Sequence, residues 1–180
     1  DSIVESEEPD VFLIMGTFGS AGIKKVMGSN TKHVIQNAII PALIVKENFK
    51  LGSLKKLTFA HDFNMQEMAP FKMVKEFSLK LDLPIDLLEV NTPNHFEDTR
   101  VSMKNMKESA ERHKIENANF NIYNSFTVEE GIMRFNNTSK NLILVVYHQR
   151  KGIAKLFNPS ITEYLVNKSS SGILAFPSLY

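Results

Sequence analysis

Apolar runs of strand length alternate with segments of helical periodicity along most of this chain. Apolar positions recur at helical spacing in Ala69–Leu81, whereas Asn141–Tyr147 is apolar almost throughout, as in a strand buried on both faces. The alternation over residues 56–180 predicts an α/β fold with a doubly wound, parallel, five-stranded sheet. The predicted strands are Lys56–Ala60, Leu83–Val90, Phe120–Tyr123, Asn141–Tyr147 and Gly172–Phe176, and the predicted helices are Ala69–Leu81, Asp98–His113, Thr127–Phe135 and a helix from Pro159 or Ser160 to Val166.

A shorter unit precedes this alternation. Val11–Met15 is an unbroken apolar run, Asn30–Ala38 has helical spacing and Ala42–Val45 is again apolar, which predicts a partial β-α-β unit with parallel strands. The connecting stretch Gly16–Ser29 is rich in glycine, and Ser29 is a good N-cap for the helix. Glycines admit close backbone approach and a helix N-terminus favours negative charge, so phosphate could bind here. The stretch matches neither the P-loop nor the Rossmann fingerprint, and a tight turn without a ligand is an equal alternative.

Three pieces of this first unit carry a family resemblance. Asp10-Val-Phe-Leu-Ile-Met-Gly16-Thr-Phe-Gly19, then Gly28-Ser29, then Ala42-Leu-Ile-Val45 resembles the end of a universal stress protein domain. The family pattern has nine residues between its second and third glycines, and here there are eight. The resemblance implies a Rossmann-like fold and an ATP site. The residues that it implies for this site are Gly16, Gly19, Gly28, Ser29 and Asn30.

Two further positions match the family at strand ends. Asp62 follows the strand Lys56–Ala60, and ligands of open α/β sheets bind beyond the carboxyl ends of strands. The resemblance implies that Asp62 faces the ribose and adenine and that Val90 lies against the adenine. The alternatives are that Asp62 caps the following turn and that Val90 is an ordinary core residue.

The two units repeat one another. Their last strands, Ala42–Val45 and Ile173–Phe176, align, and so do the strands that precede their loops. We interpret residues 1–48 as the C-terminal part of a first universal stress unit, 49–55 as a linker and 56–180 as a second unit. In the second unit Val146 and Gln149 replace two loop glycines, and Pro159, which has no N–H, replaces the third. We therefore predict that the second unit does not bind ATP through this loop.

Composition narrows the function further. The 180 residues have a net charge of +1 and no cysteine, and no apolar run approaches membrane-spanning length. These features predict a cytoplasmic protein that binds neither nucleic acid nor membranes. The five histidines lack ligand spacing, so we expect no metal, and His113, in a charged stretch, is expected to be exposed. No acid–base pair or nucleophile is recognisable, so we do not expect an enzyme.

Two functions remain. The first is a universal stress-type protein that binds or senses an adenine nucleotide, ATP, through the glycine loop of the first unit. The alternative is a tandem module that binds no nucleotide and acts as a dimerisation partner or scaffold. The last strands Ala42–Val45 and Ile173–Phe176 are expected to pair with each other or with those of a second copy, giving a homodimer.

Overall fold

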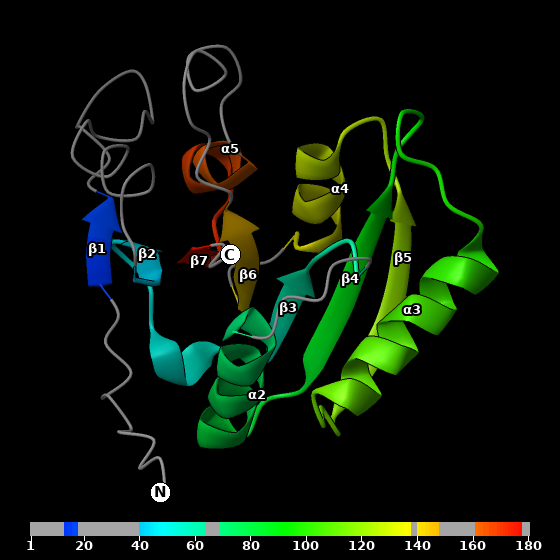
Figure 1. Ribbon diagram of the computed structural model, residues 1–180. Helices are drawn as coiled ribbons and strands as arrows, with labels where there is room; N and C mark the ends of the chain where they lie inside the picture. Colours follow the sequence, from blue (N-terminus) through cyan, green and yellow to red (C-terminus); the bar gives the residue numbers. More distant parts are fainter. Residues whose placement is uncertain (1–12, 18–39, 64–68, 138–139, 148–160, 178–180) are drawn as a thin grey trace, which may run out of the picture.

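The computed structural model describes residues 13–17, 40–63, 69–137, 140–147 and 161–177 (Figure 1). Within these ranges the strands form one sheet of seven strands in the order β1-β2-β7-β6-β3-β4-β5. The strands are β1 Leu13–Thr17, β2 Ala42–Lys46, β3 Lys56–Ala60, β4 Ile85–Asn91, β5 Ala118–Asn124, β6 Asn141–Tyr147 and β7 Gly172–Pro177. The helices are the short 3-10 turn Leu51–Ser53, α2 Ala69–Leu81, α3 Thr99–Arg112, α4 Val128–Phe135 and α5 Ile161–Lys168.

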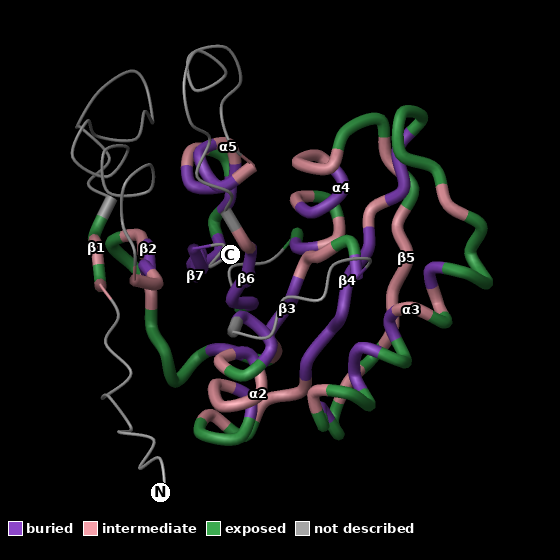
Figure 2. Tube along the Cα trace, in the orientation of Figure 1, coloured by how far each residue is buried: buried purple, intermediate pink, exposed green. Residues whose placement is uncertain are grey.

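The five strands β3 to β7 are contiguous and parallel, as the sequence predicts. Alternate residues of β6 reach opposite faces of the sheet: Leu144 joins the core beneath α2 and α3, whereas Ile143 joins the core beneath α4 and α5. This two-sided burial explains why Asn141–Tyr147 is apolar almost throughout. Buried positions concentrate on the central strands, and exposed positions lie on the outer sides of the helices (Figure 2).

Local capping accounts for the start of two helices. The Asp98 side chain accepts a hydrogen bond from the backbone N–H of Arg100 at the start of α3, and the Thr127 hydroxyl accepts one from Glu130 N–H at the start of α4. Both elements begin within a residue of the predicted position, because capping residues act through neighbours in the sequence.

The prediction that the last strands of the two units pair is confirmed. Strand β2 is antiparallel to β7, with Leu43 opposite Leu174 and Ile44 opposite Ile173. The sheet therefore has seven strands rather than the five of residues 56–180 alone, and the β2–β7 pair departs from the parallel pattern. Strands β2 and β7 each have a neighbour on both sides within the described sheet, so their pairing is formed inside this chain. The expected homodimer stays a prediction.

Strand β1 ends later than the sequence predicts. Gly16 and Thr17 belong to the strand, where they lie opposite Val45 and Lys46 of β2. The expected glycine loop therefore does not begin at Gly16. The remainder of that loop and the expected helix Asn30–Ala38 lie outside the described residues.

The expectation that His113 is exposed is wrong. Its imidazole ring stacks on the Phe71 ring of α2, with 4.2 Å between centroids and 12° between planes. Phe71 also contacts the rings of Phe59 and His61, so His113 completes an aromatic cluster between the sheet, α2 and the end of α3. Burial is the largest cause that lowers the pKa of His113, followed by the nearby charges of Arg112 and His61.

Candidate functional site

A pocket of about 470 Å³ opens beyond the carboxyl ends of β3, β4 and β6. Parallel strands bring their carboxyl ends to the same edge of a sheet, and this edge is where open α/β sheets bind ligands. Residues from two helices and from the β4–α3 connection complete the walls. The lining residues are Ala60, His61, Asp62, Leu88, Glu89, Val90, His95, Phe96, Glu97, Val128, Ile132, Val145, Val146 and Ile161.

The structure brings together two of the predicted site residues. Asp62, after β3, and Val90, near the end of β4, line the same pocket although 27 residues separate them in sequence. The Asp62 side chain is 60% exposed. In the turn that follows, Phe63 has a positive φ of 52° and its N–H donates to Nδ1 of His61 at 2.9 Å. The ring of His61 therefore accepts the first N–H after Asp62. Residues 64–68, which Asp62 would cap, lie outside the described residues.

Val90 is held against α4 by a glycine. A Cβ atom on Gly131 would lie only 2.4 Å from Cγ1 of Val90 and 3.1 Å from Cβ of Ser125. The helix can approach β4 this closely only because residue 131 has no side chain. Val128 and Ile132, on either side of Gly131, line the pocket beside Val90. Gly131 thus fixes the width of the pocket on the α4 side.

The remaining predicted residues are not among the described lining residues of this pocket. Gly16 lies in β1, which is separated from β6 by β2 and β7. Gly19, Gly28, Ser29 and Asn30 lie outside the described residues. Val146, which takes the place of the first loop glycine in the second unit, is a lining residue of the pocket and packs against the core beneath α2 and α3. The expectation that the second unit does not bind ATP through this loop stays a prediction, because residues 148–160 lie outside the described residues.

Sequence reasoning missed the polar residues of one wall. Glu89 of β4 is only 6% exposed, although it lies in a strand that the sequence predicts as apolar. The hydroxyl of Ser102, in α3, lies 2.6 Å from Oε1 of Glu89 and 3.1 Å from Oε2 of Glu97. The only signal in the sequence was a carboxylate between Leu88 and Val90, and no motif linked it to α3.

Burial is the main influence on the ionisation of Glu89. It raises the pKa of the Glu89 carboxyl, the hydrogen bond with Ser102 opposes this, and the charges of Glu97 and Asp62 raise the pKa further. The second carboxyl oxygen of Glu89, Oε2, is buried and has no hydrogen-bond partner among the described residues. A buried acid with these neighbours favours its neutral form.

The β4–α3 connection has a defined conformation over this wall. The Asn91 side chain donates to the backbone carbonyl of Glu97 at 3.2 Å and accepts from its N–H at 3.5 Å. Thr92 and His95 form a backbone bridge within the same connection. These bonds place Glu97 beside Ser102 and leave the Phe96 ring 75% exposed at the pocket.

Carboxyl groups outnumber cationic groups on the described walls. Asp62, Glu89 and Glu97 line the pocket together with His61 and His95. Within the described ranges, no set of three or more His, Cys, Asp or Glu side chains is placed to hold a metal ion. No described helix is long and apolar enough to cross a membrane.

Comparison with known proteins identifies the fold. No family model and no curated protein matches the sequence. A universal stress protein from Archaeoglobus fulgidus matches 93% of this chain over 62% of its own length, with a TM-score of 0.73 and 19% identity. A functionally unknown protein from Pseudomonas aeruginosa matches 93% of this chain over 63% of its own, with a TM-score of 0.71 and 12% identity.

A smaller solved structure has the same fold. It is a universal stress protein in complex with cAMP, and 98% of it matches 70% of this chain, with a TM-score of 0.58 and 9% identity. The present chain spans less than two thirds of the two longer proteins. Identities this low establish the fold and nothing finer. The predicted Rossmann-like fold of the universal stress type is confirmed.

Proposed function

We propose that this chain, which has the fold of the universal stress proteins, is a universal stress-type protein that binds an adenine nucleotide. The observation that supports this best is the convergence of Asp62 and Val90 on one pocket at the carboxyl edge of the sheet. A carboxylate can accept hydrogen bonds from ribose hydroxyls, and the apolar surface of Val90, Val128 and Ile132 suits the face of a base. A protein of this fold has been crystallised with cAMP, which agrees with the proposal.

Within this proposal, a phosphate-binding loop for ATP belongs to the first unit and is separate from the pocket, because β2 and β7 lie between β1 and β6. Gly16, Gly19, Gly28, Ser29 and Asn30 have the residue types of a phosphate loop, whereas the second unit has lost its glycines. The described pocket suits the nucleoside end of a ligand, since its described walls hold more acids than bases. The role is binding or sensing in the cytoplasm rather than catalysis.

The proposal is tested by titrating AMP and ATP into the whole chain by calorimetry, with wild type, Asp62→Ala and Gly19→Val compared. If the pocket holds the nucleoside, Asp62→Ala weakens AMP binding by about tenfold, the loss of one or two hydrogen bonds. The matched control is Glu116→Ala, which removes an exposed carboxylate outside the pocket.

Comparing AMP and ATP binding in these variants distinguishes the pocket from the first-unit loop. Loss of ATP binding in Gly19→Val with normal AMP binding supports separate roles for the two units. Absence of heat and of a change in melting temperature with either nucleotide in the wild type would contradict nucleotide binding altogether.

The second candidate function is the scaffold, and the β2–β7 pairing favours it. Three residue pairs join these strands. The side chain of Lys46 also donates to the backbone carbonyl of Ser169. Gly172 further leaves room for the Phe49 ring, since a Cβ there would lie 2.7 Å from Cε2 of Phe49. The two units are thus joined by backbone and side-chain contacts, as a scaffold requires whether or not a nucleotide binds.

A further inference from the structure

The contacts of Ser102 require one more hydrogen than its hydroxyl carries. A serine hydroxyl donates a single hydrogen bond, yet Oγ lies 2.6 Å from Oε1 of Glu89 and 3.1 Å from Oε2 of Glu97. If both acids were ionised, one contact would oppose two lone pairs without a hydrogen between them. We propose that Glu89, Ser102 and Glu97 hold one extra proton, carried by Glu89, and that this proton-binding site in the pocket wall links ligand binding to pH.

The surroundings place the proton on Glu89 rather than on Glu97. Glu89 is 6% exposed, and its Oε2 atom is buried without a hydrogen-bond partner among the described residues. A charged oxygen in that position is far more costly than a neutral one. Glu97 is less buried, and Nδ2 of Asn105 lies 3.4 Å from the same Oε2 atom that faces Ser102.

One arrangement of hydrogens gives each of the two contacts a hydrogen of its own. The protonated Oε1 of Glu89 donates to Oγ of Ser102, and the hydroxyl of Ser102 donates to Oε2 of Glu97. Glu97 then accepts the longer hydrogen bond, from the Ser102 hydroxyl. The 2.6 Å separation between Glu89 and Ser102 is that of an O–H···O hydrogen bond, and it is the shorter of the two contacts.

The charged groups around Glu89 act in the same direction. Glu97, on the β4–α3 connection, and Asp62, at the end of β3, both disfavour a negative charge on Glu89. The pocket also contains His61 and His95.

On the described part of α3, the cations of the first turns are paired elsewhere. Arg100 contacts Asp98, and Lys104 contacts Glu108, both at exposed positions. Glu89 therefore faces carboxylates on two elements and an uncharged serine on the third.

Loss of the proton would change the pocket itself. Glu97 belongs to the connection that also presents Phe96 and His95 to the pocket. With Glu89 ionised, the Ser102 hydroxyl can bridge only one of the two acids, and three negative carboxylates then line the described walls. The lost hydrogen bond and the added negative charge would both weaken binding of a ligand that carries phosphate. This link to a phosphate-bearing ligand rests on the proposed function, whereas the proton site itself does not.

The first experiment needs no ligand. Glu89→Gln keeps the shape of the side chain, and its amide N–H can donate to Ser102 as the protonated acid does. Urea unfolding of the whole chain is measured across pH for wild type, Glu89→Gln and the matched control Glu108→Gln, which alters an exposed acid on α3.

The expected result follows from linkage. The folded state keeps on Glu89 a proton that the unfolded chain releases near the ordinary pKa of 4.5, so wild type loses stability as pH rises from there through the raised pKa. Glu89→Gln lacks this loss, so its advantage over wild type grows with pH, and Glu108→Gln follows wild type. Parallel curves for wild type and Glu89→Gln, or lower stability of Glu89→Gln at neutral pH, would overturn the proposal.

A second measurement, made on wild type, tests the proposal even if Glu89→Gln folds poorly. Carbon-13 NMR of the glutamate side-chain carboxyls in wild type is expected to show one that titrates above 4.5, and this signal persists in Glu97→Gln. If no carboxyl titrates late, or if the late signal disappears in Glu97→Gln, the proton does not belong to Glu89.

The ligand experiment is calorimetry with AMP across the same pH range. Wild type is expected to bind AMP at least about fivefold more weakly above the titration of Glu89 than below it. The AMP phosphate titrates in the experiments with both proteins, but residue 89 titrates only in wild type. The AMP affinity of Glu89→Gln should therefore depend less on pH, and it serves as the reference. Equal pH dependence in both proteins would refute the link. If AMP binds neither protein at any pH, the proposed function fails, and the unfolding and NMR results still decide the proton site.

Discussion

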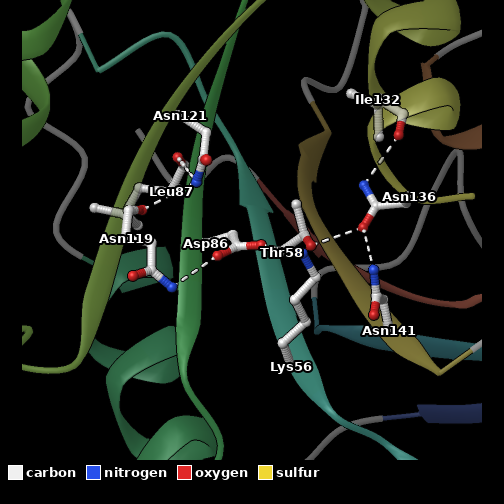
Figure 3. Close-up of polar contacts among 9 residues, drawn as sticks. All are labelled: Lys56, Thr58, Asp86, Leu87, Asn119, Asn121, Ile132, Asn136 and Asn141. Carbon is white, nitrogen blue, oxygen red and sulfur yellow. Dashed lines mark hydrogen bonds and ion pairs between the residues drawn. The ribbon is translucent and has the colours of Figure 1, made fainter. Parts of the chain in front are cut away.

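Polar side chains are buried at both ends of the central strands, and the two groups are partnered in different ways. At the amino ends, Asn136 lies at the centre of a closed network: its Oδ1 accepts from Thr58 at 2.7 Å and from Asn141 at 3.0 Å (Figure 3). Its Nδ2 donates to the carbonyl of Ile132 at 2.9 Å, which ties the end of α4 to β3 and β6. At the carboxyl ends, Oε2 of Glu89 has no partner within the described ranges.

A second group at the amino ends is also satisfied. Lys56 forms an ion pair with the buried Asp86, and Nδ2 of Asn119 donates to the other oxygen of Asp86 at 3.0 Å (Figure 3). The Lys56 ammonium also lies 4.9 Å from the centre of the Phe135 ring. The comparison indicates that the amino end stabilises the fold, whereas the carboxyl end retains polar groups that are incompletely satisfied, as binding sites often do.

The largest expected effect is at the centre of the closed network. Asn136→Ala removes the shared partner of two buried side chains, Thr58 and Asn141, and should lower the free energy of unfolding by about 3 kcal/mol. Urea denaturation measures it, with the exposed neighbour in Asn137→Ala as the control. A loss no larger than that of the control would show that this network is not needed for stability.

Removal of the Lys56 ammonium, at the same end of the strands, should lower the free energy of unfolding somewhat less. Lys56→Met leaves the Asp86 carboxyl buried beside Asn119 alone, and we expect a loss of about 2 kcal/mol, reduced because the Lys56 side chain is 31% exposed. Lys55→Met, at an exposed position, is the control. Recovery of stability in the double variant Lys56→Met/Asp86→Leu would confirm that the unpaired buried carboxylate of Asp86 causes the loss of stability.

A smaller effect on stability is expected where α4 meets the pocket. Gly131→Ala gains up to about 1 kcal/mol of helix propensity but introduces a Cβ that would lie 2.4 Å from Val90, so a net loss of about 1 kcal/mol is expected. Val90 or α4 must then shift, and AMP affinity should fall as well. Gly52→Ala, where a Cβ would meet nothing within 4 Å, is the control. Unchanged AMP affinity in Gly131→Ala would show that this contact does not shape the site.

The smallest expected effect is the contribution of His113 to the pH dependence of stability. It has the opposite sign to that of Glu89. The pKa of His113 is lowered by burial, so its contribution to stability is present above the ordinary value of 6.5 and is lost as pH falls through the lowered pKa. His113→Phe keeps a ring against Phe71 and should remove this loss. Unfolding of both proteins on either side of 6.5 measures it, and identical pH dependence would contradict the stacking contact as its source.

The sequence alone determined the order and type of the described strands and α-helices. Lys56–Ala60 and Asn141–Tyr147 have the predicted bounds, and Ala69–Leu81 and the capped start of α4 agree closely, because periodicity and capping depend on residues a few positions apart. The family resemblance placed Asp62 and Val90 at strand ends, and parallel pairing then brought them together.

The tertiary structure decided the contacts that chemistry depends on. The half-buried His113 ring stacks on Phe71, Gly131 leaves room for Val90, and Glu89 contacts Ser102. In each case the partner lies on another element, and the sequence pattern around either residue contains no trace of the other. Glutamate and histidine are usually exposed, so local pattern favours solvent, and only the packing of helices on the sheet determines which of them are buried and therefore which pKa values shift.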